Sequence, residues 1–238
     1  MCSINSPHRN DGPLITLNTG SETIYPVQCE KLLGAMVSDD FTWNAHIRDV
    51  DSSLFRTLVC RVNALAKISS SASFKTRKMI ANGIVMSKLV YLIQVWGGCH
   101  NYLIHALQLV QNRAARLVTQ LNRYTSVNKL LQQCGWLSVH QLVQYHILLL
   151  VYQVKHEKKP TYFSDKLNLE FNRETRLATS GGIRRCGTNK FSRTQSGFIS
   201  KGSQYWNVLP FEIRQSKSKT SFKVKINEWI RRNVPLHS

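Results

Sequence analysis

The residues best suited to metal chemistry are the adjacent Asp39 and Asp40, with Asp49 and Asp51 nearby. Adjacent carboxylates can hold two magnesium ions for nucleotidyl transfer. Here the pair lies in segment 38–42, between an expected strand and an expected helix. Asp is favoured at such a place by turn chemistry and by the dipole of a helix N-terminus. We therefore predict a turn and helix cap in this segment, and no metal site.

The cysteines and histidines show no metal-ligating pattern. The six cysteines stand at positions 2, 29, 60, 99, 134 and 186, and no two of them form a CxxC pair. Segment 1–11 is polar and shows no secretory signal, so we expect free thiols in an intracellular protein of unknown compartment, not a secreted one. Cofactor and small-molecule motifs such as a P-loop are also missing, so the sequence predicts no cofactor in this chain and identifies no small-molecule substrate.

A net charge of +19 is the most informative feature of the composition. Residues 1–119 hold 12 Lys and Arg against 7 Asp and Glu, and residues 120–238 hold 20 against 6. So large a charge destabilises a compact chain through self-repulsion, and it therefore indicates a polyanionic partner, nucleic acid before an anionic membrane surface. The longest aliphatic run, at 147–151, falls far short of the roughly 20 apolar residues of a membrane span, so no span is expected.

Two groups of side chains are candidates for contact with a phosphodiester backbone. The first is a polar, positive helix face over an apolar stripe, formed by Gln108, Gln111, Asn112, Arg113 and Arg116. Arginine on such a face donates to phosphates, and amides contact sugars. The second lies in a basic, glycine-rich segment near 172–203, expected to be irregular, and comprises Arg184, Arg185, Lys190 and Arg193. The alternatives are a solvated helix face for the first group and a flexible connector for the second.

Apolar periodicity predicts a mainly α chain that begins with a small β-hairpin element. Short strands are expected at 14–17, 23–27 and 30–37. Apolar residues at three- and four-residue steps predict a bundle of about six helices, at 43–66, 74–96, 102–121, 127–134, from 138 to before Pro160, and 220–232. Ser73 and the Ser138–Gln141 capping box are expected to begin helices, and Gly97 and Gly135 to end them.

Short strings along nearly the whole chain follow the order of a known family. They are Lys31-Leu32-Leu33-Gly34, Phe41-Thr42-Trp43-Asn44-Ala45-His46-Ile47, Tyr91 with Val95-Trp96-Gly97, Leu107-Gln108 with Gln111-Asn112-Arg113-Ala114-Ala115-Arg116, Gly135-Trp136-Leu137, Gly202 with Tyr205-Trp206-Asn207, Leu209-Pro210, Ile213-Arg214 and Ser221-Phe222-Lys223. The ordered set resembles jockey-like reverse transcriptases of non-long-terminal-repeat retrotransposons. The resemblance covers about 14–230 and concerns the part that follows the catalytic palm.

The resemblance implies three parts. Residues 1–42 resemble the end of a polymerase palm, 43–160 a helical thumb-like bundle, and 161–238 a basic C-terminal extension with a final helix. In that family an aromatic-x-Asp-Asp motif binds the catalytic magnesium, and it lies before the stretch that is matched here. Segment 38–40 is therefore not its counterpart.

By resemblance, Lys31, Leu33 and Gly34 lie near the primer end, and the helices from 43 to 121 grip a template–primer duplex. Resemblance and charge together predict a remnant of an RNA-directed DNA polymerase that binds RNA or DNA without its own catalytic centre. A missing palm and fingers polypeptide would be a further partner. Two alternatives stay open, namely a repurposed helical protein-interaction module and a non-functional truncated open reading frame. For Trp206 we expect a packed anchor of the tail.

Overall fold

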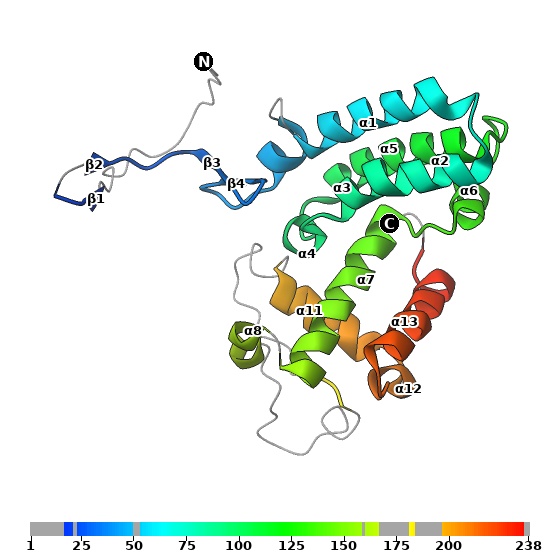
Figure 1. Cartoon of the computed structure of the whole chain (residues 1–238). Coiled ribbons are helices and arrows are strands. Elements are labelled where there is room, and N and C mark those ends of the chain that lie inside the picture. The colour runs from blue at the N-terminus through cyan, green and yellow to red at the C-terminus, as the bar shows by residue number, and fades with distance from the viewer. Residues whose placement is uncertain are drawn as a thin grey trace.

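The computed structural model of the chain describes residues 17–20, 23–49, 53–158, 160–166, 181–183 and 197–235. It is mainly helical and begins with small antiparallel strand pairs, which confirms the predicted fold class. Helices α1 (Leu54–Ser69), α2 (Phe74–Ala81) and α5 (Asn101–Thr119) pack against one another in one group (Figure 1). The strand pairs extend away from this group on the N-terminal side (Figure 1).

The N-terminal strands form two separate hairpins. Strand β1 (Leu17–Asn18) pairs with β2 (Thr23–Ile24), and β3 (Cys29–Leu32) pairs with β4 (Ala35–Ser38), both antiparallel. The single strand predicted at 30–37 is wrong, because Leu33 (φ 48) and Gly34 (φ 82) make a left-handed two-residue turn inside it. Two consecutive positive φ angles match the right-handed twist of hairpin strands. Of the strand predicted at 14–17, all but Leu17 lies outside the described residues.

The first two predicted helices are each divided. A π-helical turn η1 (Ala45–Asp49) precedes α1, which starts afresh because the Ser53 side chain accepts a hydrogen bond from the Arg56 backbone N–H. The segment 74–96 forms α2 and then η2 (Asn82–Met86), α3 (Ser87–Val90) and α4 (Ile93–Trp96). The helix is interrupted between α3 and α4, where Leu92 has a positive φ of 54°. The Trp96 indole N–H donates to the Tyr91 carbonyl at 2.9 Å and satisfies a group that the break leaves without a helical partner.

Local capping signals are confirmed where the structure describes them. Ser73 accepts the Thr76 backbone N–H at 3.2 Å, and the Ser138–Gln141 capping box is complete. Helix α4 ends at Gly97, and α6 (Val127–Cys134) ends at Gly135 in the left-handed region (φ 70). Each of these caps satisfies backbone groups that a helix end leaves exposed.

Helix α7 (Val139–Tyr152) is the central element of the C-terminal part, and it continues into the π-helical turn η3 (Gln153–Glu157). It packs against α4 and α5 at one end, and against α11 (Phe198–Val208) and α13 (Lys219–Asn233) along its length (Figure 1). One continuous apolar cluster joins all of these helices. The tail that was expected to be an extension therefore shares the core of the bundle.

Three short helices were not predicted, namely α8 (Thr161–Lys166), α11 and α12 (Phe211–Arg214). The expected irregular structure near 172–203 is wrong for 198–203, which lie in α11. Gly202 lies in that helix where a Cβ would meet Val151 at 2.9 Å, so glycine serves close helix packing there. Residues 172–180 and 184–196 lie outside the described part.

Trp206 is a packed anchor, as predicted. Its side chain is fully buried, and its indole N–H donates to the Gly181 carbonyl at 3.0 Å. The neighbouring Asn207 amide accepts the Ile183 N–H and donates to the Ile183 carbonyl, both at 2.8 Å. The string at 205–207 therefore ties segment 181–183 to α11.

Among the described residues, no single helix has the length and apolar content to cross a membrane. The pair formed by α6 and the α7–η3 segment meets that criterion only together, across a bend of 46°.

Substituting Gly97 tests the tight packing of α4 on α7. A Cβ at Gly97 would lie 2.4 Å from the Ile93 carbonyl oxygen and 2.7 Å from Val143, whereas a Cβ at Gly83 would meet nothing within 4 Å. We expect Gly97→Ala to lower the free energy of unfolding by about 2 kcal/mol or more, as overpacking does. Gly83→Ala should leave it unchanged or raise it by up to about 1 kcal/mol, as the better helix former. Urea denaturation measures both, and equal stabilities would contradict the prediction.

Candidate nucleic-acid interface

The predicted polar face of α5 is largely internal. Gln108, Gln111 and Asn112 are buried, with Gln111 only 1% exposed, so the prediction that these amides contact nucleic acid is wrong. Residue type suggested a solvated face, but other helices cover it: α5 packs against α1, α2, α6 and α7. Buried amides are stable only when they are hydrogen-bonded, and these are.

The buried amides join α5 to the beginning of α7. The Gln108 side-chain nitrogen donates to Gln111 at 2.9 Å and to Asn112 at 2.8 Å. The Gln108 oxygen accepts the Val139 backbone N–H at 2.7 Å, and Gln111 donates to the Leu137 carbonyl at 2.9 Å. These bonds satisfy backbone groups at the N-terminus of α7, so the amides have a structural role.

Arg113 and Arg116, the charged members of the same group, do reach the surface. Arg113 is exposed and Arg116 is partly exposed. They belong to a narrow strip along α5 that also includes Tyr102, His105 and Leu109, the exposed residues at three- and four-residue steps. We call these five residues the α5 strip. Contact of its arginines with a phosphate backbone stays a prediction.

Positive and negative residues are separated more sharply along the chain than a division at residue 119 shows. Residues 52–156 contain 12 Lys and Arg and no Asp or Glu, whereas residues 1–51 contain 3 against 7. The first turns of α1, α2, α5, α6 and α7 all lack acidic residues. Acidic residues at those positions would stabilise each helix by about 0.3–1 kcal/mol. These five helices do without that stabilisation, and the charged residues of the stretch 52–156 are all positive.

Half of these cationic residues are exposed. Lys67 on α1, Lys75 on α2, Arg113 on α5, and Arg123 and Lys129 around the start of α6 are exposed. No carboxylate lies within the same stretch of sequence to neutralise them. A surface of this kind attracts polyanions through its summed potential.

Arg77, in contrast, is buried and structural. Its guanidinium donates to the Val118 carbonyl at 2.9 Å, to the Ser69 carbonyl at 3.2 Å and to the Ala72 carbonyl. Ser69 and Val118 lie in the last turns of α1 and α5, where carbonyls lack helical partners and a cation is favoured by the helix dipole. Arg77 is therefore not available to an external ligand.

The second predicted group, Arg184, Arg185, Lys190 and Arg193, lies outside the described residues.

The residues expected near a primer end lie at the tip of the β3–β4 hairpin. Lys31, Leu33 and Gly34 are all exposed, Leu33 to 79%. The Tyr91 hydroxyl donates to the Leu33 carbonyl at 2.8 Å, which connects the tip to the break between α3 and α4. In β4, the Met36 backbone N–H donates to Nδ1 of His46, a buried residue of η1.

The Asp39–Asp40 segment is a turn, as predicted, whereas the next helical turn, η1, begins only at Ala45, so the predicted helix cap stays a prediction. One Asp40 carboxylate oxygen accepts the Ser38 hydroxyl at 2.5 Å, the Thr42 hydroxyl at 2.8 Å and the Thr42 backbone N–H at 3.0 Å. Nowhere in the described ranges do three or more His, Cys, Asp or Glu side chains gather in a way that could hold a metal ion.

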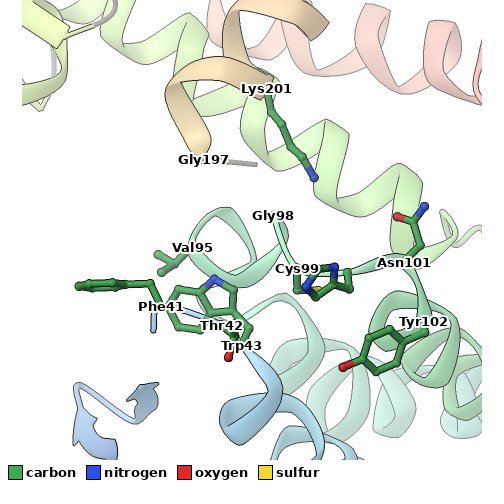
Figure 2. A pocket seen from close by; sticks show the side chains of 11 residues that line it. Phe41, Thr42, Trp43, Val95, Gly98, Cys99, Asn101, Tyr102, Gly197 and Lys201 are labelled. Carbon is green, nitrogen blue, oxygen red and sulfur yellow. The ribbon is translucent and has the colours of Figure 1, made fainter. Parts of the chain in front are cut away.

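A half-open hollow of about 900 Å³ lies beside this turn (Figure 2). Three segments far apart in sequence line it. They are residues 41–43, the segment from α4 into the first turn of α5 (Val95 and 98–102), and the beginning of α11 (Gly197 and Lys201). Figure 2 shows the Lys201 side chain pointing from α11 towards Cys99 across the hollow. Burial lowers the pKa of Lys201 and raises that of Cys99 to about 12, so this thiol is protonated at neutral pH.

Removing one buried amide tests its structural role. Gln108→Ala leaves the Val139 N–H without its partner and disrupts the amide cluster. We expect the free energy of unfolding to fall by about 1–3 kcal/mol, the range for an unsatisfied buried group. The control is Gln133→Ala on the exposed side of α6, which should change stability by less than about 0.5 kcal/mol. Similar losses in both variants, measured by chemical denaturation, would disprove the structural role.

His46 should make stability depend on pH. Burial, and secondarily the charge of Lys88, lower the pKa of His46 to about 4 from its ordinary 6.5. Between these values the unfolded chain binds a proton that the folded chain does not, so the free energy of unfolding falls as pH falls from 6.5 to 4. Denaturation curves should show a shallower decline for His46→Gln. Because burial also lowers the pKa values of His140 and His146, part of the decline should remain. Parallel curves for both proteins would refute this contribution of His46.

The chain has no match among protein-family models, curated proteins or solved structures. The resemblance to reverse transcriptases therefore rests on the ordered sequence strings alone. The structural features that bear on function are the charge of the bundle, the α5 strip and the hollow.

Proposed function

We propose that the protein binds nucleic acid through its phosphate backbone, as a thumb-like remnant of a retrotransposon reverse transcriptase. The observation that carries the proposal is the stretch of residues 52–156, which contains 12 Lys and Arg and no Asp or Glu. All of the 12 except the buried Arg77 are at least partly exposed. Phosphate contacts supply most of the affinity in sequence-independent binding, and they need cations at the surface more than a shaped pocket.

The α5 strip is the best candidate for the contact itself. Arg113 and Arg116 stand one turn apart on a rigid helix whose opposite side is held by the buried amides. Arginine binds phosphate through two parallel N–H donors, so a fixed helix presents it favourably. The two arginines of the strip also belong to one of the strings that resemble the reverse-transcriptase family, where the helices following the palm are expected to hold the duplex.

No catalytic step is proposed for this chain. Asp40, which directly precedes the string at 41–47, has a carboxylate oxygen that is already occupied by three hydrogen bonds of its own turn. Polymerisation needs carboxylates that are free to hold metal ions on the transferring phosphate. Binding is therefore the activity to test first.

A salt titration with a blunt DNA or RNA–DNA duplex tests the proposal. We expect affinity to fall steeply with salt, because bound phosphates release counterions. Arg113→Glu with Arg116→Glu should weaken binding at least about tenfold and reduce the slope of log K against log salt by about 2, roughly 1 for each phosphate that an arginine no longer neutralises. Circular dichroism should show an unchanged helix content.

The matched control reverses two exposed lysines at the other end of the molecule, Lys217→Glu with Lys225→Glu. It makes the same change in net charge and should reduce affinity less. Equal losses would show that the α5 strip is not the contact. Affinity that does not depend on salt would overturn the proposal and favour a protein-interaction module.

A further inference from the structure

The hollow beside α5 has an aromatic rim that is costly to maintain. Phe41 is 70% exposed and has a φ of 52°, which is unfavourable for a bulky side chain. The turn imposes this conformation, because Asp40 binds Ser38 and Thr42 on either side, and the Phe41 N–H donates to the Ser38 carbonyl at 2.9 Å. A strained backbone that presents an apolar ring to solvent commonly marks a binding site.

Two more aromatic side chains line the same hollow. Trp43 is partly buried against the core, and it presents the remainder of its indole to the hollow (Figure 2). Tyr102, 53% exposed, lies on the first turn of α5, and its hydroxyl bonds the Asn44 side chain. The three rings come from two segments, and both are fixed by hydrogen bonds. Exposed aromatic faces of this kind are platforms for stacking bases.

Lys201 provides the charge of the hollow. It is the one Lys or Arg among the described lining residues, and none of those residues is Asp or Glu. The polar contact of its amine is a long one, 3.5 Å to the Gly97 carbonyl, which leaves ammonium protons to donate elsewhere. A single cation among aromatic rings and without a carboxylate favours a ligand with a flat, apolar part and a negative part.

We infer that this hollow binds an unpaired nucleotide at the end of a nucleic-acid strand, with the base against Phe41 and Trp43 and a phosphate at Lys201. The inference rests on the proposed function and adds a site for the strand end to the backbone contacts of the bundle. About 900 Å³ lies within the range of small-ligand sites, roughly 300–1,000 Å³, and is open enough to admit a strand end. The tip of the β3–β4 hairpin is anchored to Tyr91, two residues before α4, the helix whose Val95 lines the hollow.

The experiment compares a blunt duplex with the same duplex carrying a four-nucleotide single-stranded overhang. The full chain should bind the overhang probe about five- to a hundredfold more tightly, which is the effect of stacking one base. A 2-aminopurine in the overhang should lose fluorescence on binding, because stacking quenches it. Phe41→Ala and Lys201→Gln should each remove most of the preference and leave blunt-duplex binding unchanged, since neither residue belongs to the α5 strip.

Matched controls carry the same changes at another exposed site. Tyr124→Ala removes an aromatic ring that is 79% exposed in the α5–α6 connection, and Lys129→Gln removes one exposed charge on α6. Both should keep the overhang preference. Blunt-duplex binding without an overhang preference, or a preference that survives Phe41→Ala, would overturn the nucleotide site and leave the proposed function intact. Failure to bind either probe would overturn both.

Discussion

Hydrogen bonds at the beginning of α7 join this helix to α5 on one side and to the end of α13 on the other. Gln108 and Gln111 make buried bonds from α5, and Gln141 donates to the Val234 carbonyl at 2.8 Å through a partly buried bond. An exposed bond, from Arg231 to the Gly135 carbonyl at 2.8 Å, adds to these. Polar groups buried here would be costly if any partner were removed. Because α7 is fixed in this way, α11 and α13 are also placed, and with α11 the Lys201 side of the hollow.

The features that could be predicted from the sequence are those set by neighbouring residues. Caps at Ser73 and at Ser138, and the stop at Gly135, depend on chemistry within a few positions, and all three form as expected. The burial of Gln108 depends instead on residue 139, which is 31 positions away, and no local pattern distinguishes such a glutamine from a solvated one. The hairpin turn at Gly34 does have a local signal, since a glycine inside a short strand is also typical of a turn.

The same distinction between local and long-range features applies to the candidate site. Its charge is visible in the composition, but division of the chain into halves combines the acidic first 51 residues with the acid-free stretch that follows. The boundary between the two lies after Asp51, and the number of charged residues in a short window of sequence changes there. The hollow has no comparable signal, because its three lining segments are separated by about 50 and about 95 residues. Only the positive φ of Phe41, which is a property of the folded backbone, shows that this exposed residue lies in a constrained turn.

The central position of α7 also determines how the chain must fold as it is synthesised. The residues that cover its apolar side come late: Phe222, whose ring stacks on Tyr152 at 4.3 Å between centroids, is made 70 residues after it. At roughly 5–20 residues per second, this side of α7 stays uncovered for several seconds during translation. Exposed apolar surface of that kind binds chaperones or aggregates, and the first 150 residues cannot complete their core by themselves. The protein is therefore expected to become native only after its last helix has left the ribosome.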